Sequence, residues 1–182
     1  MEQQDKFYSL TVAGVQRNLP ICPVSDTLDI AAFVMFSDVE LTVACARELL
    51  KKSPDFDVMI TAESKGIPLT YEMARQSGKQ YFLARKSIKA YMRQPICVEV
   101  QSITTAGSQK LYLDQEYAEQ MKGKRVLIVD DVISTGQSLQ ALEKLVNSAG
   151  GNIVGRAAVL AEGDAAKRED ITFLEPLPLF FK

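Results

Sequence analysis

The sequence contains no histidine. A chain without histidine cannot build a Ser-His-Asp triad, ligate zinc through an imidazole ring or use imidazole as a general acid or base. Any chemistry that it performs therefore depends on carboxylates, lysines, hydroxyls, backbone amides or a recruited metal ion.

Cysteine is also scarce. The three cysteines are an odd number, lie far apart and form no CxxC pair; they are Cys22, Cys45 and Cys97. This pattern argues against a disulfide framework and fits a reducing cytoplasm, which is the location we expect. We interpret Cys45 as a packing residue rather than a nucleophile, because it recurs with apolar residues at helical spacing.

Long apolar runs and an excess of basic charge are missing as well. No run approaches the roughly 20 apolar residues of a membrane-spanning helix, so we expect no membrane contact. The N-terminal residues MEQQDKFYSL are polar and acidic, unlike a signal peptide. With 21 basic and 23 acidic side chains the net charge is −2. Nucleic acid is therefore not an expected partner, since phosphate backbones are bound by clustered Lys and Arg.

The chain does have enough apolar material for a core. It has 182 residues, of which 47% are hydrophobic, and no repeat or Pro/Gly/Ser-rich linker divides it. We predict a single domain over residues 1–182. Residues 1–30 are expected to be an irregular N-terminal segment, because Pro20 and Pro23 interrupt any long element.

Strand and helix patterns alternate along the rest of the chain. Short apolar runs favour buried strands over residues 57–62, 81–84, 125–129 and 153–160. Helical spacing favours helices over residues 39–52 and 66–77 and in the segment that ends at Gly150-Gly151. Residues 96–101 and 110–113 are expected to pair as a hairpin. This order predicts an α/β fold with a central parallel sheet flanked by helices, which binds ligands at the carboxyl ends of its strands.

The most informative stretch is Val126–Ser138. An apolar strand is followed by Asp130 and Asp131, then by a short loop containing hydroxyls and Gly136, and then by a helix. The start of a helix presents unpaired N–H groups and attracts phosphate. Carboxylates accept hydrogen bonds and suit the hydroxyls of a sugar. The stretch therefore predicts a site for a ribose 5-phosphate; the alternative is that the two aspartates merely cap the helix.

This stretch is neither a Walker loop nor a dinucleotide GxGxxG motif. All thirteen positions of Val126–Ser138 are similar to the signature of the type I phosphoribosyltransferases, which bind phosphoribosyl pyrophosphate (PRPP). The resemblance covers residues 28–179 and is closest to the adenine and xanthine branch. It includes Glu63-Ser-Lys-Gly66, a turn that in this family often contains a non-proline cis peptide bond, and Ala84-Arg-Lys86. Leu28–Phe33 and Pro176–Phe180 also resemble segments of that branch.

The resemblance implies roles for individual residues. It implies that the ribose hydroxyls are held by Asp130 and Asp131. It implies that the 5-phosphate is held by Val132, Ile133, Ser134, Thr135, Gly136, Gln137 and Ser138. It implies that pyrophosphate meets Ser64, Lys65, Gly66, Arg85 and Lys89, with Lys86 as a weaker candidate. The segment 1–30 would cover the base, and the base pocket would include Leu28, Phe33 and Met35. Magnesium would be bound through the substrate, with no direct protein ligand.

The resemblance implies a purine phosphoribosyltransferase, most similar to the adenine enzymes, that acts as a homodimer with the hairpin 96–113 as a mobile lid. Adenine enzymes usually carry Glu-Tyr-Gly in that lid, whereas Ser102–Ser108 contains no carboxylate. The asparagine and lysine of xanthine enzymes are also missing near Met35 and Gly163. The alternative is therefore a non-catalytic regulatory protein that binds PRPP or a nucleotide, related to the effector domain of the purine operon repressor. Glu162 and Asp164 are expected to be exposed loop carboxylates.

Overall fold

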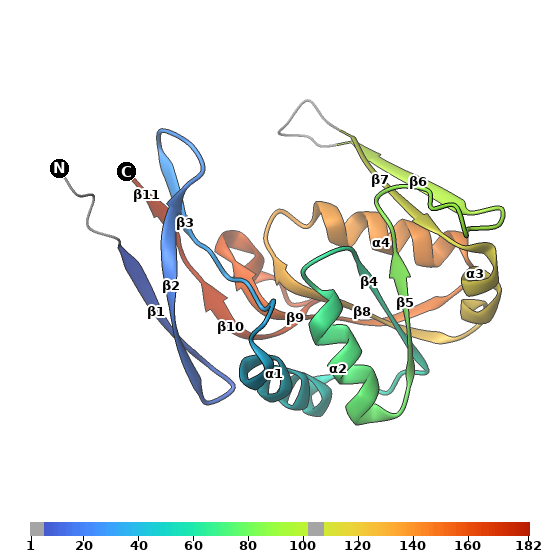
Figure 1. Ribbon diagram of the computed structural model, residues 1–182, viewed down its shortest axis with the longest axis horizontal. Coiled ribbons are helices and arrows are strands. Elements are labelled where there is room, and N and C mark those ends of the chain that lie inside the picture. The colour runs from blue at the N-terminus through green and yellow to red at the C-terminus, as the bar shows by residue number, and fades with distance from the viewer. Residues whose placement is uncertain (1–5, 102–107) are drawn as a thin grey trace.

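The computed structural model describes residues 6–101 and 108–182. Its centre is a five-stranded sheet in the order β10-β9-β8-β4-β5 (Figure 1). Every neighbouring pair in this sheet is parallel. The strands are β4 (Val58–Ala62), β5 (Gln80–Ala84), β8 (Arg125–Ile133), β9 (Asn152–Glu162) and β10 (Thr172–Leu177). The predicted α/β fold with a parallel sheet is confirmed.

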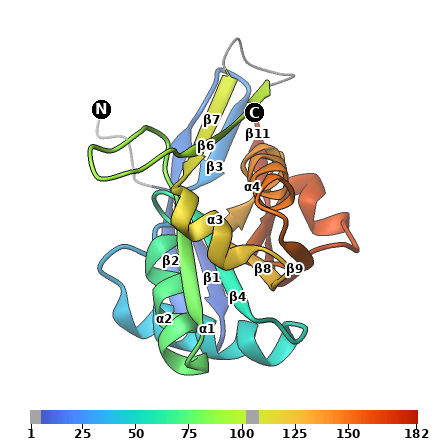
Figure 2. The same cartoon turned by 90° about the vertical axis from the view of Figure 1, so that its right-hand side faces the viewer.

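Helices cover both faces of this sheet (Figure 2). Alternate residues of β8 point to opposite faces. Val126 and Ile128 join the core beneath α3 and α4, whereas Leu127 and Val129 join the core beneath α1 and α2. The helices are α1 (Val39–Lys52), α2 (Ile67–Ser77), α3 (Gln115–Met121) and α4 (Gln137–Ser148). Because β8 is buried on both faces, its sequence is a continuous apolar run. None of the described helices is long and apolar enough to cross a membrane.

The predicted boundaries of α1 are confirmed. Asp38 caps the helix by accepting a hydrogen bond from the Leu41 N–H at 3.1 Å, and the chain leaves the helix at Ser53. Cys45 is fully buried in the core under this helix, as its spacing predicted. Burial raises the pKa of the Cys45 thiol to about 12, so the side chain is a neutral packing group at neutral pH.

The prediction that residues 1–30 are irregular is wrong. They form three strands, β1 (Phe7–Val12), β2 (Val15–Pro23) and β3 (Leu28–Ala31), which continue in an antiparallel sheet with β11 (Leu179–Phe181). Pro20 pairs with the first residue of β1, and Pro23 is the last residue of β2. The missing N–H groups therefore fall at the margins of the ladder, where proline is tolerated.

The predicted hairpin is confirmed. β6 (Ile96–Gln101) pairs antiparallel with β7 (Ser108–Leu113), with Ile96 opposite Leu113. Its apolar face packs on α4, and Tyr112 pairs through its backbone with Arg85 beside β5. Residues 102–107, and with them most of the Ser102–Ser108 stretch, lie outside the described residues. The role of the hairpin as a lid stays a prediction.

Elements that the sequence analysis did not anticipate are α3, the 3₁₀ helix η1 (Gly163–Lys167), β10 and β11. The short helix α3 is capped by Asp114, which accepts a hydrogen bond from the Glu116 N–H at 3.2 Å. At one or two turns α3 and η1 are too short for an apolar period to show. The edge strand β10 and the three-residue β11 depend on partners elsewhere in the chain.

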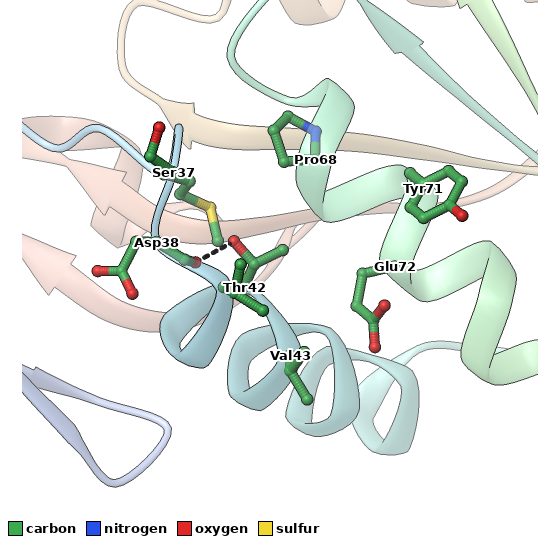
Figure 3. Close-up of a pocket in the computed structure, with 9 residues that line it drawn as sticks. Ser37, Asp38, Thr42, Val43, Pro68, Tyr71 and Glu72 are labelled. Atoms are coloured by element: carbon green, nitrogen blue, oxygen red, sulfur yellow. Dashed lines mark hydrogen bonds between the residues drawn. The ribbon is translucent and has the colours of Figure 1, made fainter.

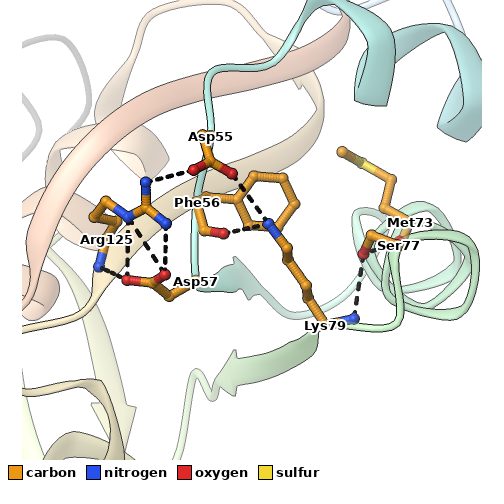
Figure 4. Close-up of polar contacts among 7 residues, drawn as sticks. All are labelled: Asp55, Phe56, Asp57, Met73, Ser77, Lys79 and Arg125. Carbon is orange, nitrogen blue, oxygen red and sulfur yellow. Dashed lines mark hydrogen bonds and ion pairs between the residues drawn. The ribbon is translucent and has the colours of Figure 1, made fainter.

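Charged side chains tie the amino ends of two central strands together (Figure 4). The Arg125 guanidinium lies 2.8 Å from Asp57 and 2.6 Å from Asp55, and the Arg125 backbone N–H also donates to Asp57 at 2.8 Å. Lys79 donates to the carbonyl of Phe56 and lies 4.2 Å from the centre of its ring. The hydrogen bonds from Arg125 lower the pKa of Asp57 to about 2.

We expect Asp57→Asn to lower the melting temperature at pH 7. A depressed folded-state pKa stabilises the protein above the unfolded pKa of about 4, and this contribution is lost as the pH falls through the folded value near 2. The difference from wild type should therefore shrink between pH 5 and pH 2 in thermal denaturation followed by circular dichroism.

Asp164→Asn is the control, since it removes an exposed carboxylate paired within η1 and should change the melting temperature very little. Equal melting temperatures for wild type and Asp57→Asn at pH 7 would contradict the assignment.

Candidate functional site

The site is built on the carboxyl end of β8. The sequence analysis placed the end of this strand at the two aspartates, but β8 continues through Val132 and Ile133. These residues pair with Leu160 and Ala161 of β9, which is itself longer than predicted. The connection to α4 is therefore only Ser134–Gly136, and the two aspartates lie within the ladder rather than in a loop.

The two carboxylates experience different surroundings. Asp131 is 4% exposed, and its Oδ2 atom lies 3.3 Å from Lys65 Nζ. Apart from this ion pair, no group among the described residues donates a hydrogen bond to this oxygen. Asp130 is half-buried and accepts the backbone N–H of Asp131 at 2.9 Å. Burial and the adjacent Asp131 carboxylate raise the pKa of Asp130.

The turn between β4 and α2 lies directly against these carboxylates. A Cβ atom on Gly66 would lie 2.4 Å from Thr61 Oγ1 and 3.2 Å from Asp130 Oδ1, so a larger residue would collide with β4 and crowd β8. Lys65 precedes this glycine and reaches Asp131 with a half-exposed side chain. The peptide bond between Glu63 and Ser64 is cis, as the resemblance led us to expect. The structure thus brings the predicted pyrophosphate turn and the predicted ribose carboxylates together.

The loop after β8 forms a small hollow. Gly136 has φ +80°, a left-handed conformation that favours glycine, and α4 begins directly after it with no side-chain cap. The alternative that Asp130 and Asp131 cap this helix is therefore wrong. The hollow is lined by Asp130 and by Val132, Ile133, Ser134, Thr135, Gly136, Gln137, Ser138 and Leu139. All seven residues predicted to hold the 5-phosphate surround this one space.

Ser138 connects the hollow to the hairpin. Its hydroxyl and the Gln109 side-chain amide of β7 lie within hydrogen-bonding distance, at 3.4 Å for the Nε2–Oγ pair. The same hydroxyl is a predicted phosphate donor, so this contact and a bound phosphate would compete for it.

The two cationic side chains that follow β5 and were predicted to bind pyrophosphate, Arg85 and Lys89, differ in their position relative to the turn. Arg85 follows β5, and its Nε atom lies 2.7 Å from Glu63 Oε2 in an ion pair that is largely shielded from solvent. Arg85 is therefore beside the turn but already paired with a carboxylate. Lys89 is half-buried, and its ammonium donates to the Ser87 hydroxyl at 2.7 Å. The structure brings Arg85, but not the Lys89 ammonium, into contact with the turn.

The three predicted base-pocket residues differ in burial. Phe33 and Met35 are 4% and 1% exposed and belong to the core beneath α1, whereas Leu28 in β3 is half-buried. Their contact with a base stays a prediction. Met35 also lines a pocket between α1 and α2, whose other walls include Val39, Pro68 and Tyr71 (Figure 3).

Glu162 differs from its expected position as an exposed loop carboxylate. It ends β9 half-buried, on the same edge as the two aspartates. Burial raises the pKa of Glu162, and the charge of Lys65 opposes this shift. Asp164 is exposed and pairs with Lys167 at 2.7 Å, as expected for a loop residue. The signal that was available for Glu162 was its place directly after an apolar strand.

We expect Asp130→Asn to raise the melting temperature at pH 8. A raised folded-state pKa means that ionising Asp130 costs stability; the native state is favoured most below the unfolded pKa near 4 and loses that advantage as the pH rises toward the folded value. The neutral amide avoids this loss and should add about 2–4 °C.

At pH 3.5 the two proteins should melt almost together, because Asp130 is then protonated in both states. Asp26→Asn, at an exposed position, controls for the loss of one negative charge. A variant that is less stable than wild type at pH 8 would show that the carboxylate is not destabilised by its surroundings.

Comparison with known proteins agrees with this geometry. The model of the phosphoribosyl transferase domain matches residues 40–177. An adenine phosphoribosyltransferase of Thermotoga petrophila is 34% identical over 122 residues, which are 67% of this chain and 64% of that protein. A hypoxanthine/guanine phosphoribosyltransferase of Methanococcus voltae is 31% identical over 156 residues, which are 85% of this chain and 77% of that protein. The matched region thus spans just under two thirds of the Thermotoga relative.

Solved structures show the same fold. An adenine phosphoribosyltransferase of Rhodothermus marinus superposes with a TM-score of 0.64 at 21% identity, covering 94% of both chains. One from Thermoanaerobacter pseudethanolicus gives 0.64 at 22% identity, covering 76% of this chain and 80% of that chain. On the extent of the domain match and of these similarities, the chain belongs to the phosphoribosyl transferase domain family.

Proposed function

We propose that the protein is a purine phosphoribosyltransferase. It would transfer 5-phosphoribose from PRPP to a purine base and give a nucleoside monophosphate and pyrophosphate. The observation that carries this proposal is the 3.3 Å approach of Lys65 Nζ to the buried Asp131 carboxylate, next to the hollow around Ser134–Ser138. Along a single edge of the sheet there are then a hydrogen-bond donor for pyrophosphate (Lys65), two acceptors for the sugar hydroxyls (Asp130 and Asp131) and a hollow for the phosphate.

This order matches the chemical layout of PRPP, whose ribose stands between a 5-phosphate and a pyrophosphate. In the proposed complex Asp130 and Asp131 accept hydrogen bonds from the 2- and 3-hydroxyls of the ribose. The 5-phosphate lies in the hollow at the start of α4, where N–H groups of Val132–Ser138 point at it. The pyrophosphate lies over Ser64, Lys65 and Gly66, and Lys65 exchanges Asp131 for a pyrophosphate oxygen.

In the proposed reaction a ring nitrogen of the base forms a bond to C1 of the ribose while the C1–oxygen bond to pyrophosphate breaks. Pyrophosphate leaves with the bonding electrons, and the base releases the proton of that nitrogen. Such a glycosyl transfer has an oxocarbenium-like transition state. The protein's part is to hold the ribose still and to neutralise the leaving group through Lys65 and Arg85. Glu63, now paired with Arg85, sets the direction in which that guanidinium points.

Magnesium bound to PRPP oxygens would add positive charge to the leaving pyrophosphate. The buried Asp131 Oδ2, which apart from its ion pair with Lys65 has no hydrogen-bond donor among the described residues, is an oxygen of the kind that such a complex or the ribose hydroxyls need. These residues therefore fit a magnesium–PRPP substrate.

We propose adenine as the base, with the N-terminal sheet as its cover. Adenine enzymes of four Thermotoga strains are 32–35% identical to this chain, although hypoxanthine/guanine enzymes match over a longer stretch. The second candidate function is regulatory binding of PRPP without turnover. It is favoured by the lack of a carboxylate in Ser102–Ser108, the stretch in which adenine enzymes usually carry one.

The test is pyrophosphate release from magnesium–PRPP with adenine, hypoxanthine, guanine, xanthine and uracil supplied separately. We expect release with adenine. Release with hypoxanthine or guanine instead would keep the enzyme and correct the base. No release with any base, alongside PRPP binding in calorimetry, would favour the regulatory protein.

The affinity of Asp131→Asn for PRPP, measured by calorimetry, tests the site. Loss of a charged acceptor of sugar hydroxyls should weaken PRPP binding about tenfold or more, while the circular dichroism spectrum stays unchanged. Wild-type PRPP affinity in this variant would remove the ribose assignment.

We also propose that the protein is a homodimer that associates through α1 and α2. Val39 and Tyr71, which line the pocket between α1 and α2, are 72% and 58% exposed, and Val34 and Phe36 in the segment before α1 are 52% and 46% exposed. Clustered exposed apolar side chains mark protein–protein interfaces. A contact there would bury surface next to the turn at Gly66.

Val39→Asp should therefore convert the dimer to a monomer in size-exclusion chromatography with light scattering. Phe181→Glu, at an exposed apolar residue of β11, is the matched control and should leave the mass unchanged. A wild-type protein that is monomeric at micromolar concentration would overturn this proposal.

A further inference from the structure

Arg168 lies against the loop that follows β8. It is the residue directly after η1, and its backbone N–H donates to the Ala165 carbonyl at 3.1 Å. Its side chain extends toward Gly136, because a Cβ atom placed on that glycine would be 2.9 Å from Arg168 Nη1. Gly136 is the last residue before α4 and lines the hollow proposed for the 5-phosphate. The Arg168 guanidinium therefore lies close to Gly136 but is not among the residues that line the hollow.

The direction of this guanidinium is fixed by a second residue. Nε donates to Asp170 Oδ1 at 2.8 Å and Nη2 donates to Asp170 Oδ2 at 2.7 Å, a two-point contact. Nη1, the nitrogen nearest Gly136, makes no hydrogen bond to any residue in the described part of the chain. The pair thus places Asp170 on one side of the guanidinium and turns its free N–H groups toward the loop. The hydrogen bonds that Arg168 donates to Asp170 also raise the pKa of Arg168, which keeps it cationic.

The surroundings of Arg168 contain one more ion pair. Arg156 of β9 pairs with Glu143 of α4, and Glu143 also attracts Arg168. This ion pair connects strand β9 of the parallel sheet to α4, the helix that starts at the hollow. Arg168 is two-thirds shielded from solvent, so salt screens its charge less than that of an exposed side chain.

The loop itself carries no cation. Val132–Ser138 contains only apolar, hydroxyl, amide and glycine residues. A phosphate monoester carries close to two negative charges at neutral pH, because its second pKa is about 6, and two aspartates stand beside it. Within this loop only backbone N–H groups, hydroxyls and one side-chain amide are available to bind the phosphate, and none of them carries a positive charge.

We propose that Arg168, oriented by Asp170, is a positioning residue of the 5-phosphate site. It supplies positive charge through Gly136 to the phosphate of the ribose substrate and holds the loop at the start of α4. This inference rests on the proposed function, since it assumes that the hollow takes the phosphate of a phosphoribosyl group.

The experiment measures the affinities of the full chain for ribose 5-phosphate and for pyrophosphate by calorimetry. Arg168→Gln should weaken ribose 5-phosphate binding about tenfold at pH 7.5 and leave pyrophosphate binding unchanged. Arg168→Lys, which keeps the charge, should recover most of the loss. At pH 5 the phosphate has lost about one charge, so the ratio between wild type and Arg168→Gln should fall to about threefold.

A purely structural role predicts a different pattern, in which the loss is the same at both pH values and Arg168→Lys behaves like Arg168→Gln. That pattern, or wild-type affinity in Arg168→Gln, would overturn the inference and leave the proposed function standing. A wild-type protein that binds pyrophosphate but not ribose 5-phosphate would overturn both. Should Arg168→Gln fail to fold, Asp170→Asn replaces it: selective weakening of ribose 5-phosphate supports the inference, and unchanged affinity contradicts it.

Discussion

Two adjacent carboxylates at the carboxyl end of a strand that is buried on both faces are the constraint on which the rest of the site depends. Removing charge from water is costly, and like charges side by side add to that cost. The molecule offsets this partly through Lys65, 3.3 Å from Asp131, and partly by raising the pKa of Asp130. The turn before α2 lies close enough for this contact, and a side chain at Gly66 would collide with Thr61 Oγ1 at 2.4 Å and crowd Asp130 at 3.2 Å.

The two ends of the parallel sheet use charge in opposite ways. At the amino ends Arg125 is surrounded by Asp55 and Asp57, so that each charge has a partner. At the carboxyl ends acidic groups predominate, and apart from its ion pair with Lys65, Asp131 Oδ2 lacks a hydrogen-bond donor among the described residues. Acceptors without donors at this edge cost folding energy, and the hydroxyls of the proposed substrate would supply the missing donors.

The antiparallel sheet next to this edge is assembled from both ends of the chain. β11 pairs with β3, and Tyr8 of β1 packs edge-to-face on Phe180 at 5.7 Å between ring centres. Lys182 pairs with Asp29 at 2.8 Å. A sheet of this kind is held by contacts between distant segments, so it is positioned by the completed fold rather than by its own strand propensity.

Local information in the sequence was enough to determine α1, four of the five strands of the parallel sheet (β4, β5, β8 and β9), the hairpin and the Val126–Ser138 motif. Helical spacing with a cap at Asp38 predicts a helix wherever the chain goes, and a strand buried on both faces requires the apolar run of β8. Only the tertiary structure decided how far β8 extends, since its last residues depend on β9 as a partner. Tertiary contacts alone also built the N-terminal sheet, buried Phe33 and Met35, and set Lys65 against Asp131 and Arg168 against Gly136. Each of these depends on residues far apart in the chain, and neither periodicity nor turn chemistry carries information about which distant segments meet.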